Sequence, residues 1–157
     1  MADEKTKTLF YKRSRFVTHL PLDYLYTPSH AWLAKPADGS WRVGLTKVAT
    51  RMLGEMVDFA FELPPDSEVK HGQIIGWVEG FKAISDVYCV AEGTFLGANP
   101  DLKKKLSAID KDCYQTGWLY AASGRADARV MDVHAYATML TKAIDKILEQ
   151  QKDTEIQ

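Results

Sequence analysis

The chain has 157 residues, of which 46% are hydrophobic, and its formal net charge is −1. This length suits one compact domain with a core of its own. The balanced charge offers no electrostatic footprint for nucleic acid, and the short, charge-interrupted apolar runs exclude a transmembrane helix and a signal-peptide core. We therefore expect neither nucleic acid nor a membrane among its partners.

The first nineteen residues are polar and irregular, and we expect a flexible N-terminal arm over 1–19. Compact structure should begin at Leu20. Trp41–Leu45 alternates as a half-buried strand does, and the turn-forming run Asp38–Ser40 should join it to a strand over Ala31–Ala34.

A short helix should follow over Lys47–Leu53, with Thr46 as its N-cap and Gly54 as its left-handed end. Strand composition returns over Glu55–Leu63, and Pro64–Asp66 then forces a turn. Short strands alternating with turns are typical of a small β-sandwich or β-barrel.

Two β-branched and aromatic runs, Gln73–Glu79 and Asp86–Val90, flank the short link Gly80–Ser85. Two strand-like runs joined by a link of this kind indicate a β-hairpin. Lys82 stands at its centre.

The remaining third of the chain should add helices and one more strand. Pro100 opens a short helix with Leu102, Leu106 and Ile109 on one face, and Gly117–Tyr120 has strand composition. Asp132 should cap a long helix with apolar residues at i, i+3 and i+4 spacing. We expect a β domain over 20–131, a helix packed on it over 132–151, and a frayed tail over 152–157.

The cysteines and histidines do not form a recognisable site. Cys89 and Cys113 lie far apart without C-x-x-C spacing, which indicates neither a zinc site nor a disulfide framework. His19, His71 and His134 show no ligand spacing, so no metal is expected. This cysteine usage fits a reducing cytoplasm, and the sequence assigns no role to either thiol.

The run Val78–Tyr88, V-E-G-F-K-A-I-S-D-V-Y, resembles the lipoylation hairpin of the glycine cleavage system H protein, whose pattern is V-E-S-[VF]-K-[AS]-x-S-D-[LV]-Y. Only Gly80 departs from it clearly. Further similar segments follow the family's order between Tyr26 and Leu140: His30–Leu33, Val43–Thr46, Leu53–Val57, Glu62–Pro64, Asn99–Leu102, Asp112–Leu119 and Asp132–Tyr136.

This resemblance implies a mainly β, lipoyl-domain-like flattened barrel or sandwich, a barrel-sandwich hybrid, with peripheral helices and a C-terminal α-helix. It implies a non-catalytic carrier with lipoate amide-linked to Lys82. The lysine amide would make an arm of roughly 10–15 Å, from about ten bonds of ordinary length. No nucleophile–base pair, phosphate loop or metal cluster at a recognisable spacing points to an autonomous enzyme instead.

The resemblance also implies a recognition loop for the attaching enzyme and for partner proteins, formed by Glu79, Gly80, Phe81, Ala83, Ser85 and Asp86. Ser85 and Asp86 also suit plain turn chemistry, in which their side chains bond nearby backbone amides. By the same resemblance, His30 would correspond to a histidine of the groove that shelters the loaded arm, although a capping or packing histidine is the simpler interpretation.

The departures from the family pattern bear on the pathway. Gly80, the run Tyr88–Gly93 and the extended ends resemble the lipoate-binding proteins of heterodisulfide-reductase-like sulfur oxidation. Our first hypothesis is therefore a carrier of sulfur-bound intermediates serving such a complex. The second is a glycine cleavage H protein that shuttles an aminomethyl group among the P, T and L proteins, where L is a dihydrolipoamide dehydrogenase.

A third hypothesis is an unlipoylated scaffold or regulatory module, because the missing serine at Gly80 could weaken recognition by a lipoate-protein ligase or lipoyl transferase. Mass analysis of Lys82 distinguishes this hypothesis from the two carrier hypotheses.

Overall fold

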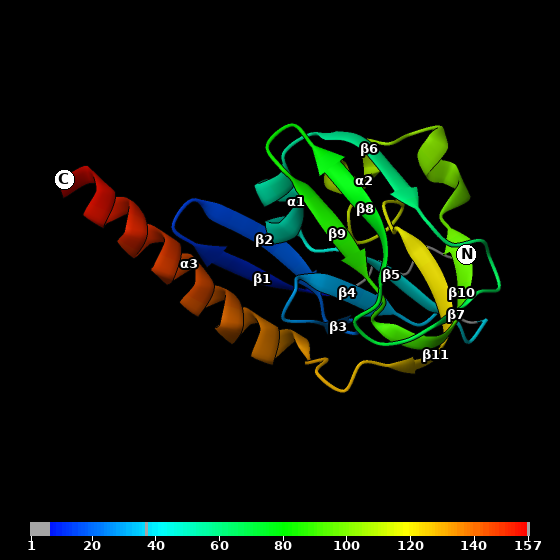
Figure 1. Cartoon of the computed structure of the whole chain (residues 1–157). Helices are drawn as coiled ribbons and strands as arrows, with labels where there is room; N and C mark the ends of the chain where they lie inside the picture. Colours follow the sequence, from blue (N-terminus) through cyan, green and yellow to red (C-terminus); the bar gives the residue numbers. More distant parts are fainter. Residues whose placement is uncertain (1–6, 37, 157) are drawn as a thin grey trace.

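The structure is a computed structural model that describes residues 7–36 and 38–156, with side chains up to Lys152. Its strands form three antiparallel sheets of two, six and three strands. Figure 1 shows two of these sheets stacked as layers and the long C-terminal helix running along one side of the molecule. Among the described residues, no helix has both the length and the apolar character that spanning a bilayer requires.

The six-stranded sheet forms one layer and has the strand order β3-β4-β5-β11-β10-β7. The expected hairpin of β4 and β5 is confirmed, with Ala31 opposite Leu45 and Ala34 opposite Arg42. The strand bounds are β3 Leu25–Tyr26, β4 Ala31–Ala34, β5 Trp41–Leu45, β7 Glu68–Val69, β10 Ala91–Ala98 and β11 Tyr120–Ala126.

The second layer is the three-stranded sheet β6-β8-β9, formed by Met56–Phe61, Ile74–Gly80 and Ile84–Tyr88. Its inward side chains Ile75, Val78 and Val87 pack in one hydrophobic core with Phe95 and Tyr120 of the other layer. The expected mainly β, flattened sandwich is therefore confirmed. The sheets do not close into a continuous barrel.

Short helices connect the strands. The expected helix α1, Lys47–Leu53, is confirmed, and Gly54 ends it with a φ of +82°. The single helix expected after Pro100 is instead a 3-10 helix, η1 (Pro100–Lys103), and a separate short helix, α2 (Ala108–Lys111). The bend between them lets Leu102 and Ile109 both enter the core.

The strand expected at Gly117 begins only at Tyr120. The preceding backbone groups have other partners: the amide of Asn99 donates to the carbonyls of Thr116 and Trp118, and the Gly117 N–H donates to the Asp112 carbonyl. These turn contacts replace strand pairing up to Trp118, and bonding to β5 starts at Leu119, whose N–H donates to the Val43 carbonyl at 2.8 Å.

Where we expected a flexible arm over 1–19, the structure has a two-stranded hairpin, β1 (Thr8–Arg13) and β2 (Phe16–Pro21). Ser14 turns the chain with a φ of +57°. Tyr11 and Leu20 point inward and are buried, but Thr18 is buried as well while Phe10 and Val17 are exposed. The two strands therefore lack the clean apolar–polar alternation that would mark them in the sequence. The first six residues of the expected arm lie outside the described residues.

The C-terminal helix α3 spans Val133–Ile156 and so continues past the expected end at 151. Its predicted cap is confirmed, because Asp132 accepts a hydrogen bond from the Ala135 N–H at 2.8 Å. No glycine or proline follows Asp132 to stop it. With the β1–β2 hairpin and part of the six-stranded sheet, α3 encloses a second hydrophobic core: Tyr11, Leu20, Tyr26, Trp32, Val133, Tyr136, Leu140 and Ile144.

Candidate functional site

The predicted hairpin around Lys82 is confirmed. Strands β8 and β9 pair with Glu79 opposite Ile84, and the Gly80 N–H donates to the Ala83 carbonyl at 2.9 Å. Lys82 is exposed at the turn. Within the described part of the chain, its ammonium has no hydrogen-bond or ion-pair partner and is open to solvent.

The backbone of this turn is held by the connection between α1 and β6. The Lys82 N–H donates to the Leu53 carbonyl at 2.8 Å, and the Phe81 N–H donates to the Glu55 carbonyl at 2.9 Å. The first bond also satisfies one of the carbonyls that the end of a helix leaves unpaired. Sequence reasoning missed Leu53 and Glu55, because backbone carbonyls carry no signature in the residue type.

Two large apolar side chains flank the lysine in solvent. Phe81 is 77% exposed and Ile84 is 66% exposed. Exposed apolar groups of this size beside a reactive amine are typical of a surface that another protein contacts.

The outer face of the β6-β8-β9 sheet is acidic. Asp58 lies opposite Glu79 in the neighbouring strand, and Asp86 lies opposite Trp77, so that all four side chains share one face. The three strands contain no lysine, arginine or histidine. Lys82, at the turn, is therefore the cation closest along the chain to Glu79 and Asp86.

A groove begins next to the lysine. Its volume is about 240 Å³, and residues 83–88 form one wall while Leu45, Leu53 and Leu119 contribute an apolar floor. Ser29 adds a polar group. The groove is thus an apolar channel that starts one residue after Lys82.

The structure brings most of the predicted loop residues together at this end of the molecule. Ala83, Ser85 and Asp86 line the groove, and Glu79 lies on the outer face. The Ser85 hydroxyl donates to the Asp86 carbonyl at 3.0 Å, a local bond inside strand β9 rather than the turn bond to a backbone amide that the sequence allowed. Gly80 is buried at the base of the turn.

His30 lies apart from the groove lining, although its neighbours Ser29 and Ala31 belong to that lining. It has a left-handed φ of +68°, and its Nδ1 is 2.9 Å from the Tyr136 hydroxyl of α3. Burial lowers the pKa of the imidazole, so the neutral ring is favoured. A role of His30 toward an arm stays a prediction.

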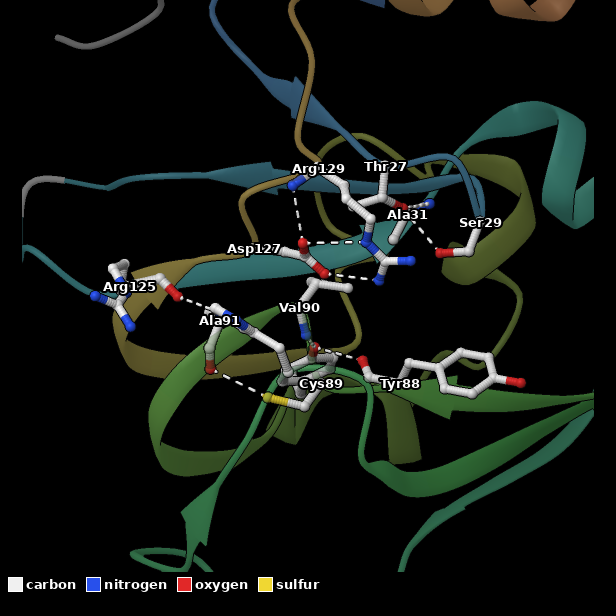
Figure 2. A network of polar contacts seen from close by, with 12 residues as sticks. Thr27, Ser29, Ala31, Tyr88, Cys89, Val90, Ala91, Arg125, Asp127 and Arg129 are labelled. Carbon is white, nitrogen blue, oxygen red and sulfur yellow. Dashed lines mark hydrogen bonds and ion pairs between the residues drawn. The ribbon is translucent and has the colours of Figure 1, made fainter.

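Both cysteines are buried. The Cys89 thiol donates to the Ala91 carbonyl at 3.2 Å, as Figure 2 shows, and burial raises its pKa. Burial likewise raises the pKa of Cys113 to about 12. Neither thiol is therefore activated as a nucleophile. In the described ranges, no group of three or more histidine, cysteine or carboxylate residues could hold a metal ion.

Comparison with known proteins assigns this architecture to a family. The family model described as "Glycine cleavage H-protein" matches residues 24–144. Two curated relatives are the glycine cleavage system H proteins of Corynebacterium jeikeium, 36% identical over 76% of this chain and 96% of that protein, and of an Enterobacter species, 33% identical over 79% and 98%. The crystal structure of a glycine cleavage system H protein from Mycobacterium marinum has 32% identity and a TM-score of 0.68, covering 76% of this chain and 97% of that one.

These findings bear on the pathway hypotheses. The relatives and the solved structure are described as proteins of glycine cleavage. The comparisons therefore support the second hypothesis and give no support to sulfur oxidation. The β1–β2 hairpin and α3 beyond Ile144 lie outside the matched segment. The match includes both layers of the sandwich and the Lys82 hairpin, and the chain belongs to the glycine cleavage H-protein family.

Proposed function

We propose that this chain is a lipoyl carrier of glycine cleavage, with lipoate joined through an amide bond to the Nζ of Lys82. The observation that carries the proposal is the exposed, unpaired amine on a turn that two backbone hydrogen bonds hold in place. Family membership supports the same assignment.

The residues around Lys82 fit the group. Amide formation needs an accessible primary amine, and this nitrogen has no competing partner among the described residues. The groove at Ala83 lies within reach of an arm of roughly 10–15 Å. When bound, lipoate would supply a dithiolane whose sulfur atoms accept and release the aminomethyl unit derived from glycine.

The protein's own residues would orient and present this attachment point. The Leu53 and Glu55 carbonyls hold the turn in one orientation, which reduces the entropy that a partner must remove on binding. Phe81 and Ile84 offer apolar contact area at the tip. Asp58, Glu79 and Asp86 favour partner surfaces that are basic.

The apolar floor of the groove would shelter the arm between visits to partner enzymes. Leu45, Leu53 and Leu119 can bury its methylene groups, at about 0.8 kcal/mol per CH₂ removed from water. Ser29 and Ser85 provide polar atoms at the same groove for the far end.

The proposed partners are a lipoate-protein ligase or lipoyl transferase, followed by the P, T and L proteins of glycine cleavage. Sulfur oxidation with a heterodisulfide-reductase-like complex has weaker support, because it depends only on departures from the family pattern at Gly80, at Tyr88–Gly93 and at the extended ends.

Intact mass spectrometry after co-expression with a lipoate-protein ligase tests the attachment. The wild-type protein should gain the mass of one lipoyl group, as should the control Lys70→Arg, whereas Lys82→Arg should gain none. The modified protein should then support glycine decarboxylation with purified P, T and L proteins. An unmodified wild type would reject the carrier, and a modified protein without decarboxylation would reject the pathway.

A further inference from the structure

Gly80 is the clear departure of this hairpin from the family pattern, and in the structure its Cα lies very close to the backbone at the end of α1. A Cβ on Gly80 would lie 2.6 Å from the carbonyl carbon of Leu53 and closer still to its oxygen, and 3.1 Å from the Gly54 oxygen. Real Cβ atoms do not come this close to backbone. The space that a serine would need is therefore filled by the end of α1.

Gly54 makes a matching approach from the other side. Its φ is +82°, and a Cβ there would lie 3.0 Å from the Lys82 Cγ and 3.2 Å from the Lys82 nitrogen. The two glycines thus let the α1–β6 connection lie directly against the lysine-bearing turn. The Lys82–Leu53 hydrogen bond of 2.8 Å is formed at this contact.

We infer that Gly80 is a positioning residue for the modification of Lys82: by having no side chain, it admits the Leu53 carbonyl that holds the lysine backbone. This inference rests on the proposed function. Gly80 is then not a weakened recognition signal, as the missing serine suggests from sequence alone. It is required by the way this chain holds its turn.

The consequence runs against the family pattern. Gly80→Ser restores the residue that H proteins usually carry, yet it must push the Leu53 carbonyl away from the turn. The backbone N–H of Lys82 then loses its acceptor, and the lysine no longer has a single orientation. Lipoylation should slow, because displacing a reacting group by about 1 Å can cost a hundredfold in rate.

The test compares the wild type, Gly80→Ser and Gly80→Ala as substrates of a lipoate-protein ligase. Both variants should lose about tenfold or more in kcat/KM, including a fall in kcat at saturating carrier. Acylation of Lys82 by a small amine-reactive ester should proceed at the wild-type rate, because the amine stays exposed. Loss of folded protein alone would leave kcat at saturation unchanged.

Gly76→Ala is the matched control. Gly76 lies in the same strand, and a Cβ there would clash with the Ala60 carbonyl of β6, away from the turn. This variant should be destabilised like the Gly80 variants but keep the wild-type kcat. A similar loss of kcat in Gly76→Ala would overturn the assignment to Gly80.

Hydrogen exchange on the wild-type protein keeps the inference testable even if the Gly80 variants fail to fold. The Phe81 and Lys82 amides should exchange far more slowly than the amides of an open turn. Rapid exchange of both would overturn the inference, as would a folded Gly80→Ser protein modified at the wild-type rate. A wild type that is never modified would instead reject the proposed function, independently of the exchange result.

Discussion

Tyr136 connects three parts of the molecule through one hydroxyl group. Its oxygen is 2.9 Å from His30 Nδ1 and 2.7 Å from Thr46 Oγ1, and its ring stacks on Tyr26 with centroids 4.7 Å apart. Thr46 was expected to cap α1 with its side chain, but that hydroxyl bonds Tyr136 and makes no cap bond. At the start of α1 the Tyr114 hydroxyl instead accepts a hydrogen bond from the Lys47 N–H, at 3.0 Å.

The neutral His30 ring makes stability depend on pH. Burial lowers the pKa of His30 in the folded state. The neutral ring's contribution to the free energy of unfolding is therefore fully present above the ordinary histidine pKa near 6.5, and it is lost as the pH falls through the lower pKa of the folded protein. His30→Asn removes the titration and tolerates the left-handed φ of +68°. Urea unfolding at pH 7.5 and pH 5 should show a smaller loss of free energy for the variant than for the wild type. An equal loss would contradict this origin of the pH dependence.

Asp127 is the buried carboxylate with the clearest partners. It is 5% exposed, and it accepts hydrogen bonds from the Arg129 guanidinium at 2.9 Å and from the Arg129 N–H at 2.9 Å (Figure 2). These bonds lower the pKa of the carboxyl group.

Asp127→Asn should therefore lower the free energy of unfolding by about 1–3 kcal/mol at pH 7, as expected for hydrogen bonds to a charged group. Because the folded pKa is lowered, the difference should vanish as the pH falls below about 4. Urea unfolding at several pH values measures it. Asp38→Asn is the control and should show little effect, since Asp38 is exposed and its side chain bonds Ser40 alone among the residues that the structure describes.

At the scale of elements, the β1–β2 hairpin is joined to α3 by two kinds of contact. Leu20 is fully buried in the second core, and Arg13 forms a bidentate ion pair with Asp145, both N–O distances being 2.8 Å. The ion pair lies in solvent, which screens it, whereas the leucine is removed from water.

Leu20→Ala should lower the free energy of unfolding by about 2–5 kcal/mol, the usual range for truncating a buried leucine. Arg13→Ala should have a much smaller effect, and high salt should reduce it further. Urea unfolding of both variants shows which one loses more free energy of unfolding. A larger loss for Arg13→Ala would show that the ion pair, not the apolar contact, attaches the hairpin to α3.

Elements with a strong local signal could be predicted from the sequence. Helix α1, the β4–β5 hairpin, the Lys82 hairpin and the start of α3 each have turn or cap residues at the expected spacing. The β1–β2 hairpin mixes apolar and polar residues on both faces, with Phe10 and Val17 exposed and Thr18 buried, so its alternation is weak until α3 is present to bury Tyr11 and Leu20.

At the scale of the whole molecule, the site was predictable only in part. The residues of the turn could be found because their types match a motif, but the contact between Gly80 and the end of α1 joins segments about 25 residues apart and involves backbone atoms. Sequence reasoning therefore identified what the hairpin presents and missed what holds it. The strand order of the six-stranded sheet was hidden for the same reason.

The acidic outer face gives the proposed modification a second effect. An amide on Lys82 is uncharged, so the acidic face that includes Glu79 and Asp86 would lose the positive charge of the adjoining turn. The finished carrier would then be more negative at its working end than the substrate of the ligase. A basic partner surface would then attract the lipoylated protein more strongly than the unmodified protein. This long-range attraction depends on ionic strength and acts before the partner touches the arm.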